Sequence, residues 1–183
     1  VFEGCTNLKP IELPRGIKVL SRKLFHNCKT LREVVMPSTI EIIGSEAFEG
    51  CDNLYSIFMP TGVKEIWSHA FSFSGLREVI IPDTVTKLGE SAFLGCRHLH
   101  STLVPGSIKT IPKFCFHGCR SLTQITICEG VESIEDAAFW VCPSLKKLFL
   151  PEGMKRFGNV DTSEYSLIDD LYVPSTLEEI VPF

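Results

Sequence analysis

A short motif recurs along the chain with a period of 23 residues, and this repeat limits the possible folds more than any other feature of the sequence. Phenylalanine occupies one position of the motif in seven successive units, with five spacings of 23 residues and one of 22. The column consists of Phe2, Phe25, Phe48, Phe71, Phe93, Phe116 and Phe139. Cysteine follows three residues later in six of the seven units, and a leucine column comes next. A fixed period in this range is typical of solenoids and propellers.

The second half of each unit predicts how one coil is built. From Leu31 to Pro37 the chain reads Leu-x-x-apolar-x-apolar-Pro. The alternation predicts a short strand with one inward face, and proline ends the strand because it has no N–H to donate. The apolar-x-x-apolar segment that follows predicts a second extended or turn segment on another side of the coil. The recurrent Ala-Phe step, as in Ala47-Phe48, predicts one helical turn.

A unit of this size cannot bury its apolar residues alone, but stacked units share a continuous core. We therefore predict a single solenoid domain over residues 1–183. The one shortened spacing falls within residues 71–76, which we predict to be a loop because loops tolerate deletions. The last unit is degenerate, with Thr162 and Tyr165 at the Phe and Cys positions. The chain has no initiator Met and both ends lie within repeats, so we interpret it as a fragment of a longer chain.

The columns together resemble a known family. The pattern Phe-x-x-Cys-x-x-Leu-x-x-Ile-x-Ile-Pro-x-x-Val-x-x-Ile-Gly-x-x-Ala-Phe, carried most completely between Phe48 and Phe93, is similar to the BspA-like class of leucine-rich repeats. The resemblance covers nearly the whole chain and fades after about Phe157. It implies an α/β leucine-rich-repeat solenoid of about eight 23-residue coils, with a parallel strand per coil and short helical turns.

The same resemblance implies a location and a kind of partner. Proteins of this class are typically secreted or attached to the cell surface, and they are associated with adhesion. We therefore expect an extracellular or cell-surface binding module whose ligand is a protein or glycan, including a host or cell-surface molecule. Two alternatives stay open, namely a structural spacer and the recognition arm of a larger surface protein or enzyme.

Charge and motif content exclude several other functions. The formal net charge of −4 argues against nucleic-acid binding, which requires a basic excess. No run of 18 apolar residues occurs, so we expect no direct membrane insertion. Ser144 to Lys147 matches the Ser-x-x-Lys signature of some acyl enzymes, but Leu145 within it is the core leucine of the repeat. We predict no catalytic residues, no enzyme activity and no cofactor.

The eight cysteines allow three interpretations, a disulfide framework, a metal site or buried free thiols. Because six of them share one column, their side chains should point the same way, which favours buried thiols over bridges. Cys115, His117 and Cys119 together offer three ligands, yet Cys119 belongs to the structural column. Zinc-type Cys-x-x-Cys spacing is lacking, so we predict no metal site.

The residues between the inward positions of the main strand should point outward, and they are unusually apolar. This column and the one beside it supply the candidate binding residues: Val35, Phe58, Ile80, Leu103, Phe149 and Tyr172, flanked by Arg32, Tyr55, Arg77 and His100. Exposed apolar residues with a polar rim mark interaction sites. Alternatively, these residues are simply good strand formers. Both interpretations stay open at this point.

Overall fold

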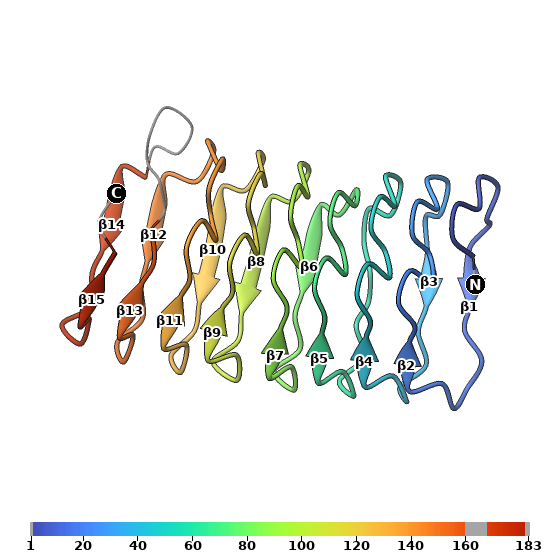
Figure 1. The fold of residues 1–183 in the computed structure, drawn as a ribbon, viewed down its shortest axis with the longest axis horizontal. Helices are drawn as coiled ribbons and strands as arrows, with labels where there is room; N and C mark the ends of the chain where they lie inside the picture. Colours follow the sequence, from blue (N-terminus) through green and yellow to red (C-terminus); the bar gives the residue numbers. More distant parts are fainter. Residues whose placement is uncertain (1, 160–167, 182–183) are drawn as a thin grey trace.

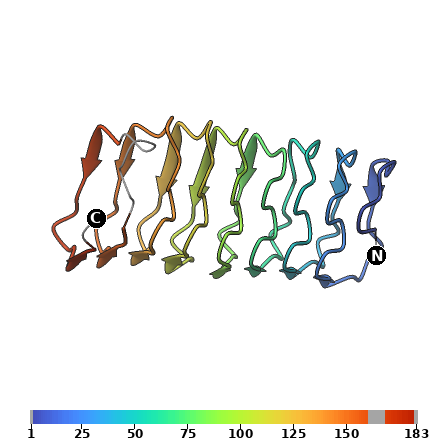
Figure 2. The same cartoon turned by 45° about the horizontal axis from the view of Figure 1, so that its top comes forward.

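A computed structural model of the protein describes residues 2–159 and 168–181, which form an elongated stack of coils (Figure 1). Two rows of short strands run along the stack on different sides of the coils (Figures 1 and 2). The front row consists of β1 (Ile11–Glu12), β3 (Val34–Val35), β6 (Glu78–Ile80), β8 (Ser101–Val104), β10 (Gln124–Ile127), β12 (Lys147–Phe149) and β14 (Asp170–Tyr172). The second row consists of β2 (Val19–Leu20), β4 (Ile42–Ile43), β5 (Glu65–Ile66), β7 (Lys87–Leu88), β9 (Thr110–Ile111), β11 (Ser133–Ile134), β13 (Arg156–Phe157) and β15 (Glu179–Ile180).

All strand pairings are parallel and follow the register of the repeat. Ile11 pairs with Val34, a spacing of 23 residues, whereas Glu65 pairs with Lys87, a spacing of 22. The deletion therefore lies between these two coils, and residues 71–76 form the loop that was predicted there. The shortened loop brings the backbone of Gly75 so close to the preceding coil that a Cβ at this position would lie 2.1 Å from the carbonyl oxygen of Asp52.

The predicted helical turns are wrong, and with them the α/β class, because the described residues contain strands and turns but no helix. The residue before the Ala-Phe step has a left-handed backbone, with φ of 58° at Glu46 and 56° at Ala137. A single left-handed residue interrupts a right-handed helix. Some backbone N–H groups of this turn bond to the next coil, as where Phe48 donates to the carbonyl of Ala70 at 2.8 Å. Others bond within the coil but reach back three residues instead of the four of an α-helix, as where Ala47 donates to the carbonyl of Gly44 at 3.2 Å. The segment predicted as extended or turn forms the two-residue strands of the second row, so a coil carries up to two strands.

The number of coils also differs from the prediction. The described residues form about seven turns, so the predicted eight coils are not confirmed. Thr162 and Tyr165, which make the last unit degenerate, lie outside the described residues. Beyond them, the pairings of Phe149 with Tyr172 and of Phe157 with Ile180 restore the 23-residue register.

The phenylalanine column forms the spine of the core. From Phe2 to Phe139 each ring lies on the next with centroids 5.2–5.7 Å apart and interplanar angles of at most 17°. The cysteine column lies beside it, and each buried thiol hydrogen bonds to a Phe carbonyl one coil earlier, as where Cys51 Sγ donates to Phe25 at 3.1 Å. The sulfur therefore satisfies a carbonyl that would otherwise keep a buried lone pair unused.

Candidate binding face

The ten predicted binding residues lie on the outer side of the front row. We call this surface the strand face. It includes residues 55–59, which lie between β3 and β6 in the stack but do not form a strand. In β6 the side chain of Val79 is buried while those of Glu78 and Ile80 are exposed, as the predicted alternation requires. Phe58 and Ile80 expose 77% and 80% of their surface. All ten residues are exposed, namely Arg32, Val35, Tyr55, Phe58, Arg77, Ile80, His100, Leu103, Phe149 and Tyr172.

Several of these residues are neighbours across the coils. Ile80 and Leu103 are direct partners in the ladder between β6 and β8, and Thr126 of β10 comes next. At the C-terminal end, the rings of Phe149 and Tyr172 lie with centroids 6.3 Å apart. The apolar column therefore consists of separate clusters with a threonine between them.

Polar contacts order the columns beside the apolar one. The guanidinium of Arg77 lies over the ring of Tyr55, 4.6 Å from its centroid, which is a cation–π contact. Lys147 forms an ion pair with Asp170 at 2.9 Å. The strand face thus carries fixed charges of both signs around its apolar clusters.

The front sheet is interrupted at two places, and a hollow opens at each. Strand pairing links β1 to β3, β6 to β8 and β10, and β12 to β14, but it does not link these groups to one another. A hollow of about 300 Å³ lies beside β3 and is lined by Val35 and Phe58 among others. A hollow of about 560 Å³ lies between β10 and β12, and Gln124, Ser144 and Lys146 contribute to its walls. The sequence analysis missed these three residues, because nothing in the repeat distinguishes these coils from the paired ones.

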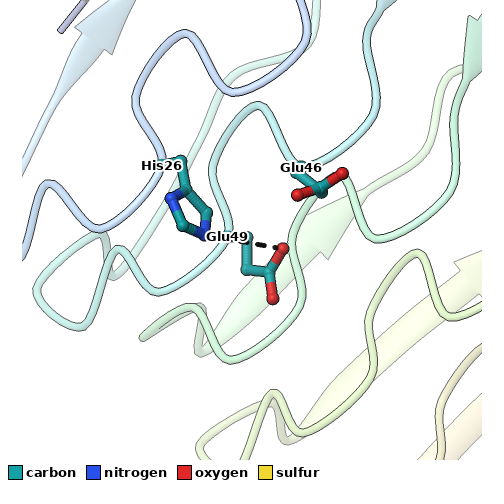
Figure 3. A group of neighbouring side chains, drawn as sticks. All are labelled: His26, Glu46 and Glu49. Carbon is teal, nitrogen blue, oxygen red and sulfur yellow. Dashed lines mark ion pairs between the residues drawn. The ribbon is translucent and has the colours of Figure 1, made fainter. Parts of the chain in front are cut away.

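A group of possible metal ligands lies on another side of the N-terminal coils (Figure 3). Ligand atoms of His26, Glu46 and Glu49 lie within 4.8 Å of one another. Glu46, however, already bonds Arg22 at 2.7 Å and Lys23 at 3.3 Å. Burial alone would raise the pKa of Glu46, but these two cations hold it below its ordinary value. A divalent cation would have to displace both, so we interpret this group as an ion-pair network between coils.

This group could have been found from the repeat. Glu3, His26 and Glu49 occupy one column at spacings of 23 residues, so stacking brings them together. His26 Nδ1 lies 3.2 Å from a Glu3 carboxylate oxygen, and its Nε2 lies 3.9 Å from Glu49.

The eight cysteines are free thiols in the structure, and six of them are buried. Burial raises the pKa of Cys96 and Cys142 to about 12, so these thiols stay protonated and unreactive while the coil is folded. Cys115 and Cys119 are buried in the core, whereas His117 packs edge-to-face on Trp140 with centroids 5.0 Å apart. Burial lowers the pKa of His117. These three residues take structural positions within their coils.

Ser144 and Lys147 do not form a nucleophile–base pair. Ser144 Oγ donates a hydrogen bond to the carbonyl of Arg120 at 2.7 Å, and the Lys147 ammonium is paired with Asp170. Both side chains are therefore engaged with other groups of the solenoid.

Comparison with known proteins agrees with this geometry. The family described as "BspA type Leucine rich repeat region" matches residues 1–100 and 93–182, with six copies of its repeat. The chain belongs to this family. Leucine-rich repeats of this type indicate a repeat-based protein-interaction module, and nothing in the described residues points to catalysis.

Solved bacterial structures share the fold of this BspA-type protein. A leucine-rich repeat protein from Bacteroides ovatus is 27% identical with a TM-score of 0.87, over 97% of this chain and 46% of that one. The chain thus spans about half the length of this relative. A leucine-rich repeat protein from T. pallidum is 26% identical with a TM-score of 0.56, over 86% of this chain and 77% of that one.

A third structure supports the fold alone. A leucine rich cell surface protein from Faecalibacterium prausnitzii is 23% identical with a TM-score of 0.61, over 95% of this chain and 62% of that one. Comparison with curated proteins gives no match. In the described part of this BspA-type chain, no helix is both long and apolar enough to span a membrane.

Proposed function

We propose that this BspA-type solenoid is a non-catalytic binding or adhesion module at the cell surface, which contacts a protein or glycan through its strand face. The observation that carries the proposal is the exposure of Phe58 and Ile80, each more than three-quarters open to solvent on one face. Burial of large apolar side chains against a partner lowers the free energy of the complex, because it removes apolar surface from water. Exposed clusters of this kind, edged by charges, are typical of interaction surfaces.

Strand propensity alone does not require apolar side chains on this face. Thr126 occupies the same column and takes part in the same ladder as Ile80 and Leu103. A polar strand former is therefore compatible with this position, and the fold does not require Phe, Ile or Leu there. An extracellular location is supported by the family.

The test is a triple substitution to serine at Phe58, Ile80 and Leu103. These side chains are exposed, so the thermal unfolding midpoint should change little. Saturable binding to immobilised surface proteins or to a glycan array should be lost. A control protein carries Val19→Ser and Phe73→Ser, which remove exposed apolar side chains outside the strand face and should leave binding intact.

Two results would contradict the proposal. Full binding by the triple variant would place the contact elsewhere, and the absence of saturable binding by the unsubstituted protein would favour a structural spacer. Circular dichroism of each variant shows whether it is folded. A variant that is folded but does not bind has lost the contact, whereas an unfolded variant does not test the proposal's contact surface.

A further inference from the structure

The hollow between β10 and β12 lies where the front sheet loses its pairing. β8 and β10 pair over four residues, and β12 and β14 over three, but no pairing joins β10 to β12. The hollow has a volume of about 560 Å³, whereas the one over the paired strands β6, β8 and β10 has about 270 Å³. The larger volume is well within the usual range of ligand sites. The interruption between β10 and β12 therefore coincides with the larger of the two hollows at the gaps of this sheet, which we call the recess.

The inner part of this recess is apolar. Ile125 and Ile127, which are 5% and 7% exposed, line it from β10. Phe149 lines it from β12 and leaves 59% of its surface open to solvent. An apolar side chain that enters here meets aliphatic and aromatic surface from both strands.

The rim of the recess carries positive charge. Lys146 and Lys147 both line it, and Lys147 is already paired with Asp170 at 2.9 Å. Lys146 forms no ion pair within residues 2–159 and 168–181. Its ammonium group can therefore form an ion pair with the carboxylate of a ligand without breaking a described contact. An ion pair at the edge of an apolar contact contributes mainly specificity and association rate.

Two of the three hydroxyl groups that line the recess are used within the protein, and only that of Thr126 forms no hydrogen bond within the described residues. Thr123 Oγ1 donates to the carbonyl of His100 at 3.2 Å, and Ser144 Oγ donates to that of Arg120 at 2.7 Å. Their O–H groups are therefore not available to a ligand. A sugar needs several such donors, whereas an apolar side chain beside a carboxylate needs only the surface and the charge that are present.

We propose that the recess between β10 and β12 binds a peptide segment of a partner protein in which a large apolar side chain lies next to a carboxylate. The apolar side chain contacts Ile125, Ile127 and Phe149, and the carboxylate pairs with Lys146. The proposal rests on the proposed function, because it names the chemistry of the partner at one place on the strand face.

The probe is a short fluorescein-labelled peptide with a central Leu-Phe pair and acidic residues on both sides, added to the purified protein and followed by fluorescence anisotropy. We expect saturable binding that weakens roughly tenfold when Lys146→Glu reverses the charge. A peptide with serine in place of Leu-Phe should bind at least about tenfold more weakly. Lys29→Glu is the control, because it reverses the charge of an exposed lysine outside the strand face and should leave binding unchanged.

Charge exchange and an apolar substitution complete the test. A peptide whose acidic residues are replaced by lysine should bind Lys146→Glu better than the unsubstituted protein. Phe149→Ser should weaken binding of the acidic peptide, whereas Phe73→Ser, which removes an exposed phenylalanine outside the strand face, should leave binding unchanged.

The outcomes separate this proposal from the function of the whole face. The proposed peptide site is wrong if the probe shows no saturable binding up to millimolar concentration. It is also wrong if Lys146→Glu binds the probe as tightly as the unsubstituted protein. If a surface ligand is then lost on substitution of Phe58, Ile80 and Leu103 but not of Lys146, the strand face keeps its function and only the recess is wrong. If a glycan array shows a ligand that Lys146→Glu and Phe149→Ser release, the recess binds sugar and the peptide proposal is wrong.

Discussion

Substitution of Ala137 by glycine tests the backbone geometry that replaces the predicted helical turns. Ala137 has φ of 56°, and Glu46, His69 and Ser91 each have φ of 58° at the equivalent position of their coils. None of these residues is glycine, although glycine adopts this region without a steric cost. The coil therefore holds a strained residue at this turn, because stacking fixes the backbone there.

The expected magnitude follows from two opposing terms. The left-handed conformation costs an L-residue about 1–2 kcal/mol. Glycine removes this cost but loses about 0.5–1 kcal/mol more than alanine through the entropy of the unfolded chain. We therefore expect Ala137→Gly to raise the free energy of unfolding by about 0–1.5 kcal/mol, with a central value of about 0.75 kcal/mol. For a chain of this size, Tm should rise by about 1–4 °C.

The assay is thermal unfolding followed by circular dichroism, with Ala138→Gly as the matched control. Ala138 is fully buried and does not have a positive φ, so its substitution by glycine should lower Tm. The two neighbouring substitutions are thus expected to have opposite signs. If Ala137→Gly lowered Tm by the amount expected for a helix interior, about 1 kcal/mol of stability, the left-handed geometry would be refuted and the helical turn restored.

Three further predictions concern the core, the thiols and the ion pairs. Phe93→Ala removes a fully buried ring stacked at 5.4 Å on both neighbours, and should cost about 3–5 kcal/mol, seen as a large fall in Tm; a small fall would show that the column does not hold the coils together. Burial raises the pKa of Cys96 to about 12, so this thiol should resist alkylation until the protein unfolds, whereas the partly exposed Cys128 should react earlier. Mass spectrometry of the labelled peptides shows which cysteine has reacted, and early labelling of Cys96 would contradict its burial. The hydrogen bond from Lys155 lowers the pKa of Glu132 in the folded state, so this pair should stabilise the protein above the unfolded pKa of about 4.3 and lose its effect as the pH falls through the lower folded value. The Tm difference between Glu132→Gln and the unsubstituted protein should accordingly disappear in acid, and a constant difference at all pH values would show that the charge is not its cause.

The buried columns could be predicted from the sequence because a period of 23 residues turns sequence spacing into spatial contact. The stacked rings from Phe25 to Phe139 follow from this rule, and so do the thiols beside all of them except Phe71, whose coil has Ser74 at that position. So does the exposure of Ile80, which depends only on the alternation within a strand. These features need no knowledge beyond the repeat and the geometry of an extended chain.

The Ala-Phe turns could not be predicted in the same way, and the second row of strands could be predicted only as extended or turn segments. A helix satisfies its backbone within one segment, whereas in this fold the N–H of Phe48 donates to Ala70 of the next coil. The choice between these arrangements is made by stacking, so a local pattern of alanine and phenylalanine does not decide it. The two-residue strands of the second row are likewise defined by their neighbours.

The candidate site shows the limit of the repeat as a source of function. A column assigns the same role to every coil, yet the recess exists because β10 and β12 fail to pair although their sequences fit the same pattern. The charge at its rim is also absent from the two preceding coils, since the column of Lys146 carries Thr123 and His100 there, although Arg32 and Arg77 occupy it nearer the N-terminus. Stability in such a solenoid comes from what the coils share, because each coil is held by its neighbours. Selective recognition requires side chains that one coil has and the others lack. The affinity for a ligand should therefore be more sensitive to substitutions at such irregular positions than to substitutions at positions that repeat in every coil.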